Sequence, residues 1–181
     1  MLKLQPYNGA LFFPLRVERH IVLSHKDAFL MALRLSMPDE NEPASLRLLF
    51  AGASALLLIV RLTPDARTLR ILREQAEAYG MHAVVEVFDE SDLAIARESG
   101  ARIIQVNARD LDTLKTDRQA CLEMGKLRRE GEVWIAASAM SAGAHLREAV
   151  EAGFQAVLMG TALMDGGKPG EKLAAILEET T

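Results

Sequence analysis

GMHAVVEVFDESDLAIARESGARIIQVN, residues 80–107, decides the fold. Two short apolar runs, Ala83–Val87 and Ile103–Asn107, flank a segment that reads as a helix. The runs are continuous rather than alternating, which indicates strands buried on both faces, as in a parallel sheet covered by helices. Gly80 and Gly100 stand just before the runs, where a helix end needs the left-handed conformation. The stretch therefore predicts a strand–helix–strand unit.

The same unit recurs on both sides of this stretch. Further apolar runs, each taken as a strand, are Ala55–Val60, Val133–Ser138 and Ala156–Gly160. The five runs recur about every 25 residues, a period that is typical of a (β/α) barrel or a doubly wound sheet. For the helices between them we expect N-caps at Thr63, Asp89 and Ser141.

The length of 181 residues predicts a single α/β domain over residues 1–181. A complete eight-unit barrel needs about 200–250 residues, so we expect about six strands in place of eight. Residues 28–35 are the sixth candidate, as a strand or as a helix, and residues 1–27 are expected to be irregular or helical.

Composition excludes several classes of protein. The net charge of −4 argues against a nucleic-acid or membrane-surface binder. A single cysteine, Cys121, excludes an intrachain disulfide and a cysteine-built zinc site, and the four histidines lack metal-ligand spacing. The longest apolar run, residues 53–60, is far shorter than the roughly 20 residues that span a bilayer. With no signal peptide visible at the start, we expect a cytoplasmic protein.

Candidate functional residues stand where the predicted strands end, because parallel α/β folds carry their active sites at that edge. Glu86 interrupts the apolar run VVEV, and a buried carboxylate is either paired in a structural ion pair or functional. Asn107 and Arg109 suit a polar, anionic ligand, although a capping Asn and a solvated Arg are the alternative. Ser138 and the pair Gly160–Thr161 follow the last two strands, where backbone amides can hold phosphate. Cys121 and Trp134 are expected to be packing residues.

Five strings in their order and spacing resemble the indole-3-glycerol phosphate synthase family of tryptophan biosynthesis. They are AGASALLLIV (51–60), YGMHAVVEVFDESDL (79–93), SGARIIQVNARDLDTL (99–114), VWIAASAM (133–140) and AVLMGTALM (156–164). The resemblance covers roughly residues 51–178. It implies a TIM-barrel-type (β/α)8 fold, of which this chain would hold units three to eight. It also implies a lyase that uses no metal or organic cofactor. Such a lyase closes the ring, decarboxylates and dehydrates 1-(2-carboxyphenylamino)-1-deoxyribulose 5-phosphate.

The resemblance also implies roles for individual residues. Glu86 matches the catalytic glutamate of the family's fifth strand, and Asn107 and Arg109 match the substrate-binding pair of its sixth. Ser138 matches a substrate- and phosphate-binding serine, and Gly160 with Thr161 matches the phosphate-binding pair after the eighth strand.

The sequence departs from the family at several catalytic positions. The glutamate and glycine that flank the seventh-strand serine are replaced by Ala137 and Ala139, and the first-strand segment has no counterpart. The general-acid lysine of the third strand falls on Ala32 in one register and on Lys26 in the other.

These departures leave three functions open. The chain is a divergent synthase, a non-catalytic phosphate-ligand-binding or interaction protein derived from one, or a reduced or engineered barrel fragment. An incomplete barrel leaves unpaired strand edges, so we expect a homo-oligomer or a complementing chain, unless residues 1–35 fold over the gap.

Overall fold

The five predicted strands form within one residue of their expected bounds in a computed structural model, which describes residues 11–14, 54–110 and 113–180. They are β2 (Ala55–Ile59), β3 (His82–Val87), β4 (Ile103–Asn107), β5 (Val133–Ala137) and β6 (Ala156–Met159). A further short strand, β1 (Leu11–Pro14), was not expected. The hydrogen-bonded strand order is β1-β6-β5-β4-β3-β2. The sixth strand is therefore β1, and the candidate at residues 28–35 lies outside the described residues.

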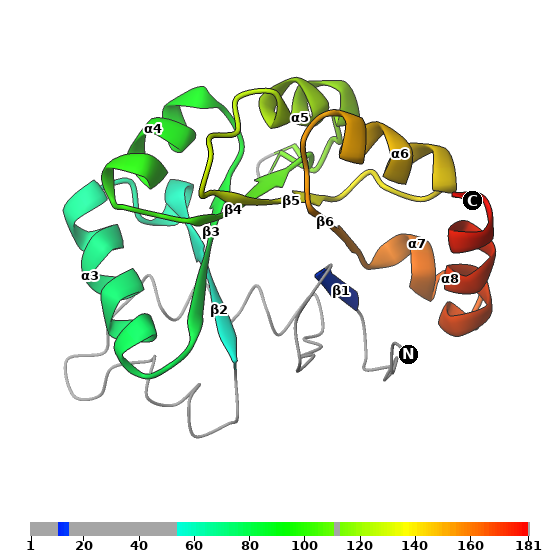
Figure 1. The fold of residues 1–181 in the computed structure, drawn as a ribbon, viewed down its shortest axis with the longest axis horizontal. Coiled ribbons are helices and arrows are strands. Elements are labelled where there is room, and N and C mark those ends of the chain that lie inside the picture. Colours follow the sequence, from blue (N-terminus) through cyan, green and yellow to red (C-terminus); the bar gives the residue numbers. More distant parts are fainter. Residues whose placement is uncertain (1–10, 15–53, 111–112, 181) are drawn as a thin grey trace. The chain divides into compact units, whose positions relative to one another are not determined.

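Strand pairing is parallel among the predicted strands. β2 pairs with β3 in parallel, with Ile59 opposite Glu86, and β5 pairs with β6 in parallel. β1 runs antiparallel to β6, with Leu11 opposite Met159. The predicted α/β class and the barrel-type alternation of strand and helix are confirmed, with five parallel strands among the residues described (Figure 1).

Helices lie between and after the strands. They are α3 (Ala66–Ala78), α4 (Glu90–Glu98), α5 (Arg118–Gly125), α6 (Gly143–Glu151), α7 (Thr161–Met164) and α8 (Pro169–Glu178). A short 3-10 turn, η1 (Val60–Leu62), ends β2. Three glycines follow helices and have positive φ: 76° at Gly80, 85° at Gly100 and 102° at Gly153. Residues with a Cβ are strained in this left-handed conformation.

Two of the three predicted N-caps are wrong. Asp89 does cap α4 and accepts a hydrogen bond from the Asp92 amide. The cap of α3 is Asp65 rather than Thr63, because the Asp65 carboxylate accepts hydrogen bonds from both the amide and the hydroxyl of Thr68.

The second wrong cap is at α6, which begins after Ala142 with no side-chain cap of its own. The Gly143 amide instead donates to Glu179, which follows α8, at 2.7 Å. A Cβ on Gly143 would lie 2.4 Å from the Glu179 Cβ, so this close approach requires glycine. A capping partner 36 residues away replaces the predicted local cap at Ser141.

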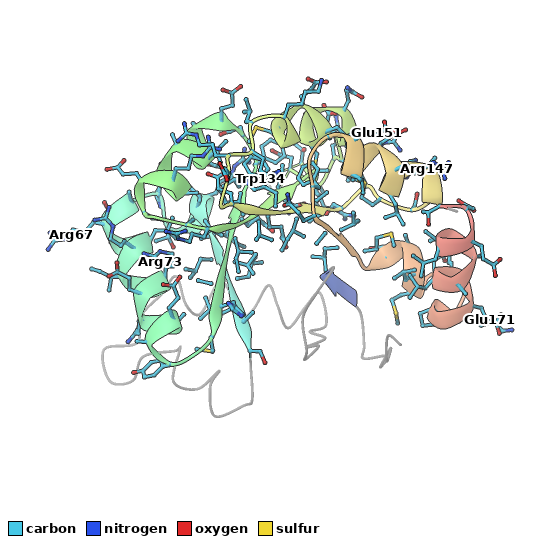
Figure 2. The ribbon with its side chains drawn as sticks, viewed as in Figure 1. Arg67, Arg73, Trp134, Arg147, Glu151 and Glu171 are labelled. Atoms are coloured by element: carbon cyan, nitrogen blue, oxygen red, sulfur yellow. The ribbon has the colours of Figure 1, made fainter. Side chains whose placement is uncertain are left out.

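The described residues fall into two compact units. The β3 unit comprises residues 54–105 and 129–133, and the β5 unit comprises residues 11–14, 106–110, 113–128 and 134–180. The core of the β3 unit includes Leu58, Val85 and Leu69, all buried. In the β5 unit the Trp134 ring packs against Phe154 with centroids 6.0 Å apart. Figure 2 shows Trp134 in the interior, whereas Arg67 and Glu171 point away from the ribbon.

Candidate active site

Glu86 is a buried carboxylate near the carboxyl end of β3. Its exposed fraction is 6%, and apolar residues flank it along the strand. Its Oε2 accepts a hydrogen bond from Gln105 Nε2 at 2.5 Å. Gln105 lies on β4 and belongs to the β3 unit, as Glu86 does. A charged acceptor strengthens such a bond, so the amide fixes one oxygen of the carboxylate.

The sequence prediction missed Gln105. Its exposed fraction is 2%, and its Oε1 has no hydrogen-bond partner among the residues described. The signal was present, because Gln105 is a polar residue inside the apolar run IIQVN, just as Glu86 is inside VVEV. A buried polar side chain in a continuous apolar strand is a candidate functional residue whether or not it is charged.

The β5 unit holds a second polar group at the ends of β4 and β5. Asn107 Oδ1 accepts hydrogen bonds from the Ser138 hydroxyl at 2.8 Å and from the Arg109 amide at 3.0 Å. The Nε of Arg109 is buried and has no hydrogen-bond partner among the described residues. A guanidinium with an unused donor is suited to binding an anionic or hydroxyl-bearing ligand.

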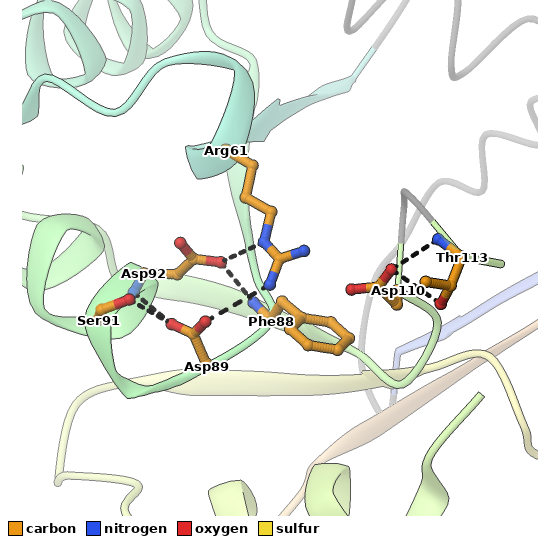
Figure 3. A network of polar contacts seen from close by, with 7 residues as sticks. All are labelled: Arg61, Phe88, Asp89, Ser91, Asp92, Asp110 and Thr113. Carbon is orange, nitrogen blue, oxygen red and sulfur yellow. Dashed lines mark hydrogen bonds and ion pairs between the residues drawn. The ribbon is translucent and has the colours of Figure 1, made fainter. Parts of the chain in front are cut away.

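The chain after Arg109 turns back on itself. Arg109 forms an isolated antiparallel bridge with Thr116, and Asp110 Oδ1 accepts hydrogen bonds from the amide and hydroxyl of Thr113 (Figure 3). This turn is described on both sides of residues 111–112. Its internal hydrogen bonds fix the backbone of Arg109 relative to α5 within the same unit.

The loop after β5 contains backbone strain. Ser138 and Ala139 adopt φ of 66° and 54°, in the left-handed region that disfavours residues with a Cβ. Strain of this kind collects at ligand-binding loops, where surrounding contacts hold it in place. Here the hydrogen bond from Ser138 to Asn107 provides one such contact.

Replacement of Ala139 by glycine is expected to stabilise the protein by about 0.5–1 kcal/mol, because glycine removes the left-handed penalty at this position. Thermal unfolding followed by circular dichroism measures the change, which corresponds to about 1–4 °C. Ala136→Gly is the matched control, since Ala136 is buried in extended β5 and its replacement is expected to destabilise. A lower melting temperature for Ala139→Gly contradicts the prediction.

The remaining predicted site residues are placed as follows. Gly160 precedes α7, and its carbonyl accepts hydrogen bonds from the Leu163 and Met164 amides at 3.0 and 3.1 Å. Thr161 is exposed at the first position of that helix. Both belong to the β5 unit, with Asn107, Arg109 and Ser138. Lys26, its alternative Ala32 and the predicted irregular segment 1–27, except for β1, lie outside the described residues.

A charged cluster stands at the ends of β2 and β3. The Arg61 guanidinium lies 4.1 Å above the Phe88 ring and pairs with Asp89 and Asp92 at 3.4 and 3.5 Å (Figure 3). Burial raises the pKa of Asp92, against the hydrogen bond from the Phe88 amide that lowers it. The hydrogen bond from Ser91 lowers the pKa of Asp89. These mutual contacts hold the cluster together at the edge where β3 ends, which indicates a structural role.

Cys121 is a packed thiol, as expected. It is buried on α5 and its Sγ donates to the Val106 carbonyl at 3.7 Å. Burial raises the pKa of the thiol to about 12. A thiol with so little thiolate at neutral pH is a poor nucleophile.

Alkylation of Cys121 by iodoacetamide at pH 8 is expected to be at least about 100-fold slower in the native protein than in the urea-unfolded chain, since both access and thiolate are lost. Because the sequence contains one cysteine, the mass shift reports this thiol alone. Native labelling at the unfolded rate would contradict the burial.

The described part of the chain contains neither a membrane-spanning helix nor a metal-binding cluster of side chains. No helix there is long and apolar enough to cross a bilayer. Nor do three or more His, Cys, Asp or Glu side chains of those residues gather where they could hold a metal ion.

Comparisons with known proteins give one consistent family. The model of the indole-3-glycerol phosphate synthase family matches residues 46–176. The synthase of Chloroherpeton thalassium is 41% identical over 138 residues, covering 76% of this chain and 50% of that protein. The synthase of a Parafrankia species is 36% identical over 130 residues, covering 72% and 48%. The chain thus spans about half the length of these curated relatives.

A solved structure extends the comparison to the fold. Deoxyribose phosphate aldolase from Aeropyrum pernix superimposes with a TM-score of 0.55 at 19% identity, over 80% of this chain and 64% of that one. At this identity the likeness concerns the fold alone.

Proposed function

The chain belongs to the indole-3-glycerol phosphate synthase family, and from this membership we propose that it acts as a lyase of tryptophan biosynthesis. The proposed reaction is the ring closure, decarboxylation and dehydration of 1-(2-carboxyphenylamino)-1-deoxyribulose 5-phosphate. The single observation that supports it best is the buried Glu86 carboxylate with its amide donor, because this reaction needs a positioned proton-transfer group.

In this proposal Glu86 moves protons, and the polar group of the β5 unit orients the substrate. Asn107 and Arg109 offer an amide and a guanidinium to the substrate's hydroxyl and anionic groups. Ser138 and the backbone amides near Gly160 and Thr161 bind its phosphate. Left-handed residues at 138 and 139 support this assignment, because turns of that kind expose backbone amides.

A turnover assay on the purified chain tests the proposal. Formation of indole-3-glycerol phosphate, separated by chromatography from its substrate, is the expected result. Substrate binding without turnover would favour the non-catalytic alternative, in which the replacement of two flanking residues by Ala137 and Ala139 has removed the chemistry. A chain that shows no substrate binding and no turnover would contradict the proposal.

The proposal includes a homo-oligomer or a complementing chain. β2 ends the order of described strands, whereas β1 lies on β6 at the other end. Strand edges are templates for pairing with another chain, so the two end strands of the described order, β1 and β2, are the favoured contacts. Sedimentation of the purified chain at micromolar concentration is expected to show a dimer, and a monomer at that concentration would contradict the homo-oligomer. A cytoplasmic location is also proposed, since a single buried thiol suits a reducing compartment.

A further inference from the structure

We propose that Gln105 is a positioning residue for Glu86, an inference that rests on the proposed function. Gln105 Nε2 lies 2.5 Å from Glu86 Oε2, and the two side chains stand on neighbouring strands, 19 residues apart in sequence. Both residues are buried, with exposed fractions of 2% and 6%. This bond fixes the carboxylate plane, which otherwise turns easily about its last torsion.

Packing alone does not explain a glutamine at this position. Its Oε1 is buried without a partner among the described residues, and an unmet acceptor in the interior destabilises the folded state. Leucine or methionine would fill the space without that cost. What glutamine adds is a donor for the carboxylate, and costs of this kind are tolerated where a site needs a fixed geometry.

The choice of a neutral donor is also informative. A lysine or arginine at position 105 would form an ion pair at this contact and oppose proton uptake by the carboxylate. The neutral amide of Gln105 orients the carboxylate through a hydrogen bond without adding a positive charge at this contact, which suits a group that gives and takes a proton. Gln105 therefore acts through Glu86, and its removal changes the orientation of the proton-transfer group rather than contacts with substrate.

Gln105→Met tests this in two backgrounds. In the otherwise unchanged chain we expect kcat to fall about 10- to 100-fold, with KM within about threefold, because misplacement of a reacting group affects the chemical step. In the Glu86→Gln background the same substitution is expected to change kcat less than about twofold, because there is no carboxylate left to position. The control is Ser99→Ala, which removes a buried hydrogen bond to the Ala96 carbonyl in the same unit and is expected to leave kcat unchanged.

Three outcomes would overturn the proposal. The first is an unchanged kcat for Gln105→Met in an active chain, which leaves the proposed function intact. The second is an equal loss in both backgrounds, which indicates a structural effect. The third is an unsubstituted chain without turnover, which contradicts the proposed function as well. If Gln105→Met does not fold, Gln105→Asn serves instead, since its shorter amide does not reach the carboxylate and the same loss is expected.

Discussion

Replacement of Glu86 by glutamine is expected to lower kcat of the proposed lyase reaction by about 100- to 10,000-fold, the range that a general acid or base contributes. The substitution keeps the size of the side chain and an oxygen that accepts the hydrogen bond from Gln105. It removes only the ability to exchange a proton. Steady-state rates of indole-3-glycerol phosphate formation measure the loss.

The matched control is Glu98→Gln, which makes the same chemical change on an exposed residue of α4 in the same unit. Its rate is expected to equal that of the unsubstituted chain. Melting temperatures of both variants establish that each is folded at the assay temperature. A Glu86→Gln variant that keeps more than a third of kcat would remove Glu86 from the proposed mechanism.

The strands could be predicted from sequence because their signal is local. A strand buried on both faces carries a continuous apolar run, so the pattern of apolar residues predicts β2 to β6 within one residue. The N-cap of α4 was predictable for the same reason, since Asp89 lies three residues before the amide it accepts from.

The features that were missed depend on residues far apart in sequence. The α6 amide that Glu179 caps has its partner just after α8, and the donor to Glu86 lies on another strand. β1 escaped prediction because it is four residues long and is defined by its antiparallel pairing with β6. Site residues at strand ends were recognisable by type, whereas the hydrogen bonds among them required the register of the sheet.

Trp134→Ala is expected to destabilise the protein by about 3–5 kcal/mol, the largest stability effect we predict. Trp134 is completely buried at the start of β5, and its ring packs at 54° against Phe154. Truncation leaves a cavity beside a ring that loses its partner. The Phe154 ring already lies against Gly125, where an added Cβ would come within 2.5 Å of it, so the site is tightly packed rather than adaptable. Urea unfolding followed by far-ultraviolet circular dichroism measures the effect, because the sequence contains no other tryptophan for fluorescence.

Two further substitutions separate the cavity from other causes. Trp134→Phe keeps an aromatic contact with Phe154 and is expected to cost about half as much or less, since less volume is lost. Val133→Ala changes the neighbouring residue, whose exposed fraction is 46%, and is expected to cost under about 1 kcal/mol. If Trp134→Ala were as mild as Val133→Ala, the β5 unit would not depend on this aromatic pair. A graded series from Val133→Ala through Trp134→Phe to Trp134→Ala instead shows that stability depends on how much of the Trp134 ring remains packed against Phe154.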